Sequence, residues 1–387
     1  MIFLNARFLT QPVSGVQRYA RELVGALDDA LATGCPGFGP VVALHPKGEI
    51  EDPGWQAIEL RAASGGQGHF WEQGALARAA WSGVLLSLGN SGPLLHPRQV
   101  ICFHDANIWA LPEAFSPRYR VLHRALRPPL ARRAKGLMTV SRFSAMDLAP
   151  RLGVDARRFE IVPNSAAHIL NIAPDARVLQ RFGLTSGAYL LSVGNQSPNK
   201  NLRRLVIAHG QCGPDVPKLV VAGGRVPGLA AGQGTGLATV ASRVITTGRV
   251  SDAELRALYD GAKGFVFPSL YEGFGIPPLE AMQLGVPVLA SRRTALPEVL
   301  GDAPIWFDPM EISDIARSLQ AFARLDKCAR ARMAAAGRGV ASRFTWANSA
   351  GRLIELLRRV QQPDGKRTVS AVRPISPRSV ARLTWRK

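Results

Sequence analysis

Short apolar runs alternate with longer segments of helical periodicity along almost the whole chain. Six runs in the first half each end in a polar or glycine-containing loop, at residues 1–4, 40–44, 83–89, 99–105, 136–141 and 159–164. Five more follow at residues 189–195, 218–224, 243–248, 264–269 and 286–291. Continuous apolar runs joined by helices are typical of buried parallel strands. The sequence therefore predicts an α/β protein with two doubly wound, Rossmann-like domains.

The length of 387 residues also fits two domains. We place the N-terminal domain at residues 1–170 and the second at 171–345, because the strand-like run that ends at residue 164 is followed by helical sequence. Residues 346–361 form an amphipathic pattern that predicts a helix, which we expect to pack back toward the N-terminal domain. Residues 362–387 hold seven Lys or Arg against one Asp, so we predict a flexible basic tail.

The composition narrows the class of protein and its compartment. The 48 Lys and Arg against 28 Asp and Glu give a formal charge of +20, which bears on the binding partners of the protein and does not indicate its fold. The four cysteines lie far apart without a CxxC pair, which argues against a disulfide framework or a Cys-based zinc site and favours a reducing compartment. No apolar run approaches the roughly 18–20 residues of a membrane span, and the start of the chain does not resemble a signal peptide. We therefore expect a cytoplasmic protein.

Residues 265–309 carry the strongest chemical signal. A predicted strand leads into a loop with Gly273 and Gly275, and a helix follows. Glu272 lies in the loop and Glu280 in the first turns of the helix, eight positions apart. Backbone N–H groups at a helix N-terminus bind anions, and carboxylates accept hydrogen bonds from sugar hydroxyls. The segment therefore offers phosphate-binding amides between two carboxylates that suit sugar hydroxyls. The alternative is that a glutamate here only favours the helix dipole.

The string from Glu272 to Glu280, EGFGIPPLE, resembles the E-x7-E signature of the large family-4 group of retaining, nucleotide-sugar-dependent glycosyltransferases. Its continuation, EAMxxGxPVxAS and then LPEVxGDA, is also similar to that family. Further similar segments lie at residues 14–19, 71–73, 87–93, 104–105, 193–201 and 247–252. The resemblance implies the GT-B fold, in which two Rossmann-like domains face a cleft, and the transfer of a hexose from a nucleotide sugar.

The resemblance also implies roles for residues in the second half. Glu280 is expected to bind the nucleotide ribose, and Glu272 to hold the donor sugar together with the backbone of residues 273–275 (Gly273, Phe274 and Gly275). Lys200 is expected to neutralise the diphosphate, in a loop that also contains Gly194 and Asn195. Many members carry an arginine before this lysine, whereas Asn195 and Gln196 stand here. Arg249 or backbone amides would then share the phosphate contacts.

In the first half, the resemblance implies that His104 lies against the donor sugar and that Gly15 allows close approach of the backbone to phosphates or acceptor. We thus expect His104, Glu272 and Lys200 to be the catalytic residues. The family reacts on one face of the sugar through the departing phosphate, without a protein nucleophile. Since the sequence has no DxD in a suitable loop and no His/Cys ligand spacing, we predict metal-independent chemistry with no resident cofactor.

The positive charge suggests a surface for an anionic partner. Residues 114–146 contain no acid, and Tyr119, Leu122, Ala125 and Leu126 share one helical face, with Arg120, Arg124 and Arg127 on another. A basic amphipathic helix favours an anionic membrane surface, but its apolar face could equally join the core. Together with the basic tail, this pattern favours peripheral attachment to the inner face of the cytoplasmic membrane.

We expect a nucleotide-sugar donor, with GDP-mannose first, and a glycan or polyprenyl-diphosphate-linked acceptor in exopolysaccharide or lipopolysaccharide synthesis. Another sugar-nucleotide enzyme of the same fold is one alternative. A basic protein that binds nucleic acid or membranes without transferase activity is the other. The chain lacks zinc-finger spacing, an RNP-like aromatic strand and a clear helix-turn-helix, which argues against nucleic acid.

Overall fold

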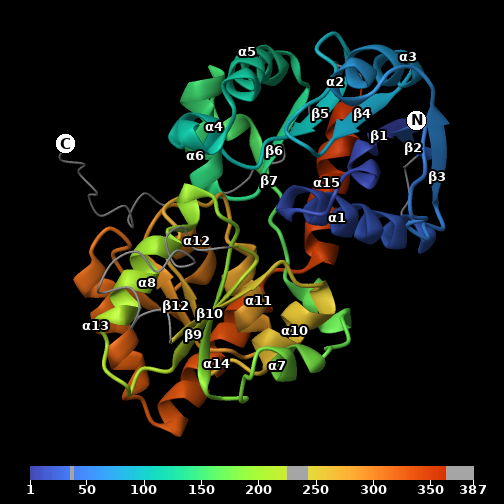
Figure 1. The fold of residues 1–387 in the computed structure, drawn as a ribbon. Coiled ribbons are helices and arrows are strands. Elements are labelled where there is room, and N and C mark those ends of the chain that lie inside the picture. The colour runs from blue at the N-terminus through green and yellow to red at the C-terminus, as the bar shows by residue number, and fades with distance from the viewer. Residues whose placement is uncertain (35–38, 225–242, 363–387) are drawn as a thin grey trace.

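The computed structural model describes residues 1–34, 39–224 and 243–362. Two α/β units, each built on its own parallel sheet, lie one above the other (Figure 1). We call the unit around the first sheet the N-terminal domain and the unit around the second sheet the C-terminal domain. The predicted fold class is confirmed. The predicted basic tail lies outside the described residues from 363 onwards.

The N-terminal sheet has seven parallel strands in the order β3-β2-β1-β4-β5-β6-β7. The strands are β1 Ile2–Asn5, β2 Val41–Pro46, β3 Ile58–Ala63, β4 Val84–Ser87, β5 Gln99–Cys102, β6 Gly136–Thr139 and β7 Phe159–Ile161. Their connections contain η1 Arg7–Thr10, α1 Gly15–Ala32, α2 Gly68–Trp71, the π-helical η2 Glu72–Leu76, α3 Ala77–Ala79, α4 Asn107–Ala110, η3 Pro112–Ala114, α5 Pro117–Arg133, α6 Arg142–Leu152 and η4 Ala156–Arg158. Helices cover both faces, so the central strands are buried throughout.

The C-terminal sheet has six parallel strands in the order β10-β9-β8-β11-β12-β13. The strands are β8 Tyr189–Val193, β9 Lys218–Ala222, β10 Val244–Gly248, β11 Gly264–Phe267, β12 Val288–Ser291 and β13 Ile305–Phe307. Before the last helix, the described residues of this half form the helices η5 Ala167–Asn171, α7 Arg177–Arg181, η6 Pro198–Lys200, α8 Leu202–Gly210, α10 Asp252–Asp260, α11 Ile276–Gln283, α12 Leu296–Leu300, α13 Ile312–Ala323 and α14 Lys327–Ala341. Strand order reverses between β8 and β11, and ligands of open α/β sheets bind at such reversals.

All eleven apolar runs are strands, whereas β3 and β13 were not predicted. Both are edge strands. Residues of β3 are mostly exposed or half-buried, and two of the three residues of β13 are half-buried. An edge strand is covered less than a central one and has no need of a continuous apolar run, which explains why these two lacked the signal.

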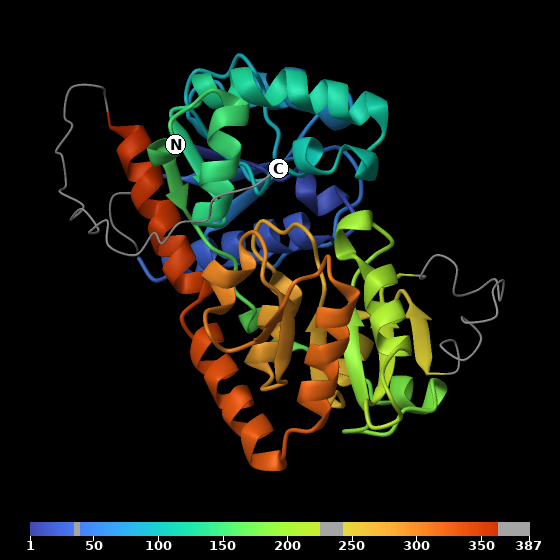
Figure 2. The same ribbon diagram turned by 90° about the vertical axis from the view of Figure 1, so that its left-hand side faces the viewer.

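The last helix, α15 Trp346–Gln361, leaves the C-terminal domain and runs along the N-terminal domain (Figure 2). It packs against α1, and Ser349 Oγ donates a hydrogen bond to the carbonyl oxygen of Pro163 at 2.8 Å. Nearby, Ser165 Oγ donates to the carbonyl oxygen of Phe344 at 2.7 Å. The segment that enters the C-terminal domain and the segment that leaves it are therefore hydrogen-bonded to each other.

Helix α5 leaves part of its apolar face outside the core. The side chains buried in the domain are His123, Arg127, Leu130 and Ala131. Leu122 is 44% exposed and Val121 is 70% exposed. Arg127, which we grouped with Arg120 and Arg124 on one helical face, is buried, because its guanidinium lies over the ring of Trp109 and donates to the carbonyl oxygen of Asp105.

Candidate functional site

The loop after β11 brings Glu272 next to Lys200. Lys200 Nζ donates to Glu272 Oε1 at 2.7 Å, and Ser269 Oγ donates to the same oxygen at 2.6 Å. Both charged side chains are mostly buried, with 19% of Lys200 and 15% of Glu272 exposed. Within the described residues, Glu272 Oε2 has no hydrogen-bond partner. The pair therefore offers one cation and one free carboxylate oxygen at the same point.

Asparagines hold the lysine loop against the loop that carries Glu272. The carbonyl oxygen of Asn199 accepts a hydrogen bond from the backbone N–H of Leu270 at 2.7 Å, and Ser269 Oγ lies 2.9 Å from the same oxygen. Asn201 has a left-handed backbone, with φ of 53°, and its Nδ2 donates to the carbonyl oxygens of Pro268 and Pro309. These bonds fix the position of Lys200 relative to Glu272, although the two residues lie far apart in the sequence.

Three glycines bring the loops after β8 and β9 close together. A Cβ on Gly194 would lie 3.2 Å from Cβ and Cγ of Lys200. A Cβ on Gly224 would lie 3.0 Å from the carbonyl oxygen of Gly194, and Gly223 has a φ of +97°. The Gly223–Gly224 pair was not predicted as part of the site, although its place at the end of an apolar run could have indicated it. Close backbone packing at this edge requires residues without side chains.

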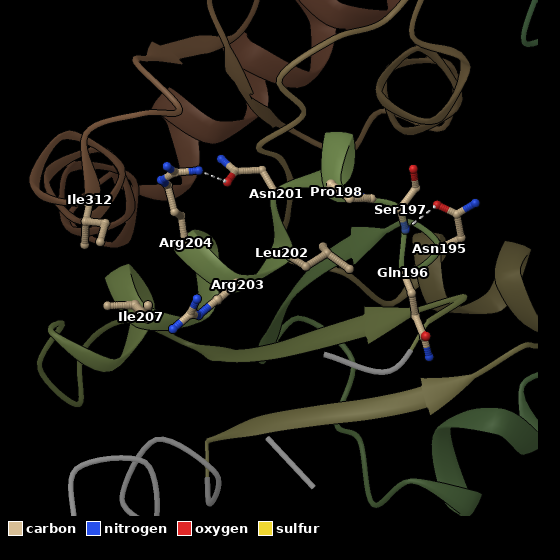
Figure 3. A pocket seen from close by; sticks show the side chains of 10 residues that line it. All are labelled: Asn195, Gln196, Ser197, Pro198, Asn201, Leu202, Arg203, Arg204, Ile207 and Ile312. Carbon is tan, nitrogen blue, oxygen red and sulfur yellow. Dashed lines mark hydrogen bonds between the residues drawn. The ribbon is translucent and has the colours of Figure 1, made fainter. Parts of the chain in front are cut away.

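A cavity of about 490 Å³ lies beside this loop (Figure 3). It is lined by the 195–198 loop, by residues of α8 including Arg203 and Arg204, and by Ile312 of α13. Arg204 is directed toward Asn201, and its Nη1 donates to Asn201 Oδ1 at 3.0 Å. Neither Lys200 nor Glu272 lines the cavity. It therefore adjoins the Lys200–Glu272 pair without containing it.

Gly273 lies where the two domains meet. A Cβ at this position would be 2.6 Å from the carbonyl oxygen of His104 and 3.0 Å from Asp105 Cβ. The carbonyl oxygen of Gly273 accepts hydrogen bonds from Ser141 Oγ at 2.7 Å and from Ser144 Oγ at 3.1 Å. The carboxyl ends of β5 and β11 thus face each other, and only a glycine fits between them.

Two further contacts hold the domains together around this point. Tyr271 OH accepts a hydrogen bond from the backbone N–H of Ala106 at 3.1 Å and donates to Asp147 Oδ2 at 2.5 Å. Glu298 accepts from the backbone N–H groups at the start of α6, those of Arg142 at 2.8 Å and Phe143 at 2.9 Å. The C-terminal domain thus supplies a carboxylate cap to a helix of the N-terminal domain.

The predicted His104 is a buried, neutral side chain at the end of β5. Its Nε2 lies 2.8 Å from the carbonyl oxygen of Leu88. Because a carbonyl can only accept, Nε2 carries the proton and Nδ1 is a hydrogen-bond acceptor. Burial lowers the pKa of His104 to about 4, and the charge of Arg127 acts in the same direction. Burial raises the pKa of the adjacent Asp105, and the charge of Glu272 acts in the same direction.

Glu280 lies on α11, and its hydrogen-bond partners are residues other than Lys200 and Glu272. Its Oε1 is bonded to His168 Nε2 at 2.9 Å, and its Oε2 accepts from Tyr259 OH at 2.9 Å. The residue is 8% exposed. Each carboxylate oxygen can accept two hydrogen bonds, so one lone pair on each oxygen remains for a ligand hydroxyl. Neither His168 nor Tyr259 was predicted as part of the site.

The other predicted residues are placed as follows. A Cβ on Gly15 would lie 3.9 Å from Ile276, so the start of α1 faces the start of α11. Gly275 has a φ of +100° and begins α11. The ring of Phe274 is buried against Phe344, which leaves its backbone for any ligand. Asn195 and Arg249 are both exposed, and Asn195 Oδ1 accepts from the backbone N–H of Ser197.

Comparison with known proteins identifies the family. Residues 180–340 match the family described as glycosyl transferases group 1. The O-antigen chain mannosyltransferase B of Escherichia coli is 34% identical over 273 residues, which are 65% of this chain and 68% of that protein. The chain belongs to the group 1 glycosyltransferases. The O-antigen chain mannosyltransferase RfbU of Salmonella typhimurium is 29% identical over 236 residues, 58% of this chain and 63% of that protein.

The fold of this glycosyltransferase is shared with solved structures. The crystal structure of Anabaena Alr3699/HepE in complex with UDP and glucose superposes with a TM-score of 0.68 at 18% sequence identity, over 92% of this chain and 98% of that one. The predicted GT-B fold and the predicted transferase class are thus confirmed. Among the described residues, no helix has the length and apolar character to span a bilayer, and no three His, Cys, Asp or Glu side chains converge as metal ligands.

Proposed function

We propose that this glycosyltransferase moves mannose from GDP-mannose to a growing glycan of a bacterial surface polysaccharide, with retention of configuration and without a metal ion. The observation that carries the proposal is the Lys200–Glu272 pair beside Gly273, where the domains touch at His104. A cation suited to a diphosphate and a carboxylate suited to sugar hydroxyls meet there. The similarity to the Escherichia coli mannosyltransferase supports mannose as the sugar and a surface glycan as the acceptor.

In this reaction the bond between C1 of the sugar and the diphosphate breaks, and the acceptor hydroxyl bonds to C1 on the same face. Lys200 stabilises the negative charge that develops on the departing diphosphate. Glu272 Oε2 accepts a hydrogen bond from a sugar hydroxyl, and neutral His104 accepts one at Nδ1. The proton of the acceptor hydroxyl passes to the departing diphosphate, so the step needs no protein nucleophile.

Glu280 binds the ribose of the nucleotide in this proposal. Tyr259 and His168 hold its carboxylate, and the remaining lone pairs accept from the two ribose hydroxyls. The exposed Arg249 and the backbone of residues 194–195 share the phosphates with Lys200. Donor binding therefore depends on the C-terminal domain, and His104 contributes from the N-terminal domain.

The test is thermal stabilisation by GDP, UDP and dTDP, each with and without EDTA. A nucleotide at about 100 times its Kd adds roughly 2.7 kcal/mol to the stability of the folded state. We expect stabilisation by GDP in EDTA for the wild type and for Lys218→Met, an exposed lysine on β9, and its loss in Glu280→Ala and Lys200→Met. Stabilisation by UDP alone would exclude GDP-mannose. RNA binding without any nucleotide response would favour the nucleic-acid alternative.

We further propose that helix α5 attaches the enzyme to an anionic membrane surface. Val121 and Leu122 are exposed, and so is Met146 on the adjoining helix α6. Exposed Arg118, Arg132 and Arg133 lie on the same α5 helix. Apolar side chains that enter the lipid interface beside basic side chains are typical of peripheral attachment.

Vesicle flotation tests this attachment. We expect the wild type to float with vesicles of 30% phosphatidylglycerol and not with pure phosphatidylcholine. Val121→Glu/Leu122→Glu should lose binding, whereas Leu170→Glu, at a 51% exposed position on η5, should retain it. Deletion of residues 363–387 separates the contribution of the tail from that of α5. Equal flotation of wild type and the α5 variant would refute the assignment.

A further inference from the structure

A buried carboxylate of the N-terminal domain has no part in the donor site. Glu72 is 1% exposed, and its Oε1 accepts hydrogen bonds from Asn5 Nδ2 at 3.0 Å and from Ser91 Oγ at 2.9 Å. Arg7 Nε lies 3.1 Å from Oε1, and His69 Nδ1 lies 2.8 Å from Oε2. Burial acts to raise the pKa of Glu72, but His69, Arg7 and Asn5 together hold it below its usual value. Glu72 is therefore an ionised group with donors on both oxygens.

These donors come from several elements near the carboxyl ends of the neighbouring strands β1 and β4. Asn5 ends β1, Arg7 begins the next turn, and Ser91 follows β4. His69 lies on α2, and Glu72 begins the π-helical turn Glu72–Leu76. Single π-helical turns are rare and occur frequently at functional sites. The carboxyl ends of parallel strands are also where α/β domains bind ligands, so this cluster lies at the functional edge of its domain.

Arg7 also lines a cavity of about 310 Å³ at this edge, next to the ends of β1 and β2. The polar side chains of its lining are those of Arg7, Thr10, Gln11, Lys47, Glu49 and Gln67. Its volume is within the range of small-molecule sites. Because Gln67 and Gly68 lie just before His69, the cavity and the Glu72 cluster share both Arg7 and the start of α2.

The chemistry of the lining suits hydroxyl groups better than a phosphate. Two amides, one hydroxyl and one carboxylate accept hydrogen bonds, and the amides and cations donate them. The charge of Arg7 is offset by the buried Glu72, and Glu49 lies in the same lining as Lys47. A phosphate requires an excess of positive charge, whereas sugar hydroxyls both donate and accept.

The cavity also lies close to the point where the domains meet. Gln11 of the lining accepts a hydrogen bond from Gln17 Nε2 of α1 at 2.9 Å. Four residues later, Gly15 faces Ile276 of α11. Four residues span at most about 14 Å. A short oligosaccharide can therefore extend from the cavity to this junction between α1 and α11, the helix that carries Glu280.

We propose that this cavity binds a neutral sugar residue of the glycan acceptor, and that Glu72 is a positioning residue that holds Arg7 toward it. This inference rests on the proposed transferase function and names a subsite on its acceptor side. The acceptor then binds the enzyme through a sugar that precedes the reacting one, and the cavity favours glycans of more than one residue.

The experiment uses α-mannotriose as the probe, in the presence of saturating GDP, with binding followed by calorimetry. Lys47→Met and Gln67→Ala change exposed side chains of the lining, and Lys218→Met is the matched control. We expect each lining variant to raise the Kd for mannotriose at least about five-fold, with the Kd for GDP unchanged. An unchanged Kd for mannotriose in both would overturn the subsite while GDP binding leaves the proposed function standing. Absence of GDP binding in the wild type would overturn both.

Two further arms test the sugar class and the role of Glu72. Displacement of mannotriose by inorganic phosphate would overturn the assignment to a neutral sugar. Glu72→Gln should raise the acceptor KM with little change in kcat or in GDP binding, and Glu72→Asp should restore part of the affinity. If Glu72→Gln lowers only thermal stability and leaves the acceptor KM unchanged, Glu72 has no positioning role.

Discussion

Replacing Gly273 with alanine tests whether catalysis requires the domains to meet as closely as they do here. The backbone of Gly273 is not left-handed, so alanine is allowed there and only space is at issue. The new Cβ would lie 2.6 Å from the carbonyl oxygen of His104, well inside the 3.4 Å at which ordinary contact begins. Since that oxygen belongs to the backbone, it cannot rotate away. The two domains have to separate instead.

Separation weakens the hydrogen bonds that Ser141 and Ser144 donate to the carbonyl oxygen of Gly273. Overpacking of this kind typically costs about 1–3 kcal/mol. If this free-energy cost applies to the arrangement in which the two domains touch at Gly273, kcat/KM falls by roughly 5- to 150-fold. Stabilisation by GDP should remain, because the proposed nucleotide contacts all lie within the C-terminal domain.

The assay is transfer from GDP-mannose to mannotriose, with Gly351→Ala as the matched control. A Cβ on Gly351, in the middle of α15, meets nothing within 4 Å. This variant should keep wild-type kcat/KM and gain about 0.5–1 kcal/mol of stability, because glycine is unfavourable inside a helix. Wild-type kcat/KM in Gly273→Ala would refute the reasoning, since the reaction would then tolerate a wider junction.

Three other predictions concern single residues. Lys200→Met should lower kcat by about 10²–10³-fold in the same transfer assay, because it removes the charge aimed at the leaving group, whereas Lys218→Met should be unaffected. Glu298→Ala should cost about 0.5–2 kcal/mol in urea unfolding, because the N–H groups of Arg142 and Phe143 at the start of α6 lose their acceptor, although the N-cap Ser141 remains; an unchanged unfolding midpoint would contradict this. Burial lowers the pKa of His104 to about 4, so the unfolded chain binds more protons between about pH 6.5 and 4, and stability falls as the pH falls through this window. Between pH 7 and pH 4.5 the free energy of unfolding of the wild type, measured in urea, should fall by about 2–3 kcal/mol more than that of His104→Gln. Equal decreases would contradict this, because His104 would then take up its proton over the same pH range in the folded and the unfolded state.

The central strands were predictable because burial on both faces leaves a continuous apolar run, which is a local property of the sequence. The edge strands β3 and β13 lacked this signal. For helix α5, hydropathy left open whether Leu122 faces the core or the outside, and it is exposed. Arg127 is buried instead, because Trp109 and the carbonyl oxygen of Asp105 receive its guanidinium. These partners come from a separate segment, which periodicity within one helix does not report.

The motif residues of the candidate site were found from the sequence, but their contacts were not. Glu272 and Lys200 are 72 positions apart, and nothing local indicates that they form an ion pair. The need for a glycine at position 273 comes from its contact with His104 of the other domain, which lies 169 residues earlier in the sequence. Glu280 was assigned to a ligand, and no local pattern indicates that Tyr259 and His168 hold its carboxylate.

The return of α15 to the N-terminal domain limits how the two domains can move. The polypeptide crosses between them twice, and the two crossings are bonded to each other where Ser165 meets Phe344 and Ser349 meets Pro163. Two linked crossings act as one hinge, so opening and closing become a rotation about a single axis through these residues. A spin-label pair across the hinge-distal edge of the two domains would measure this rotation directly.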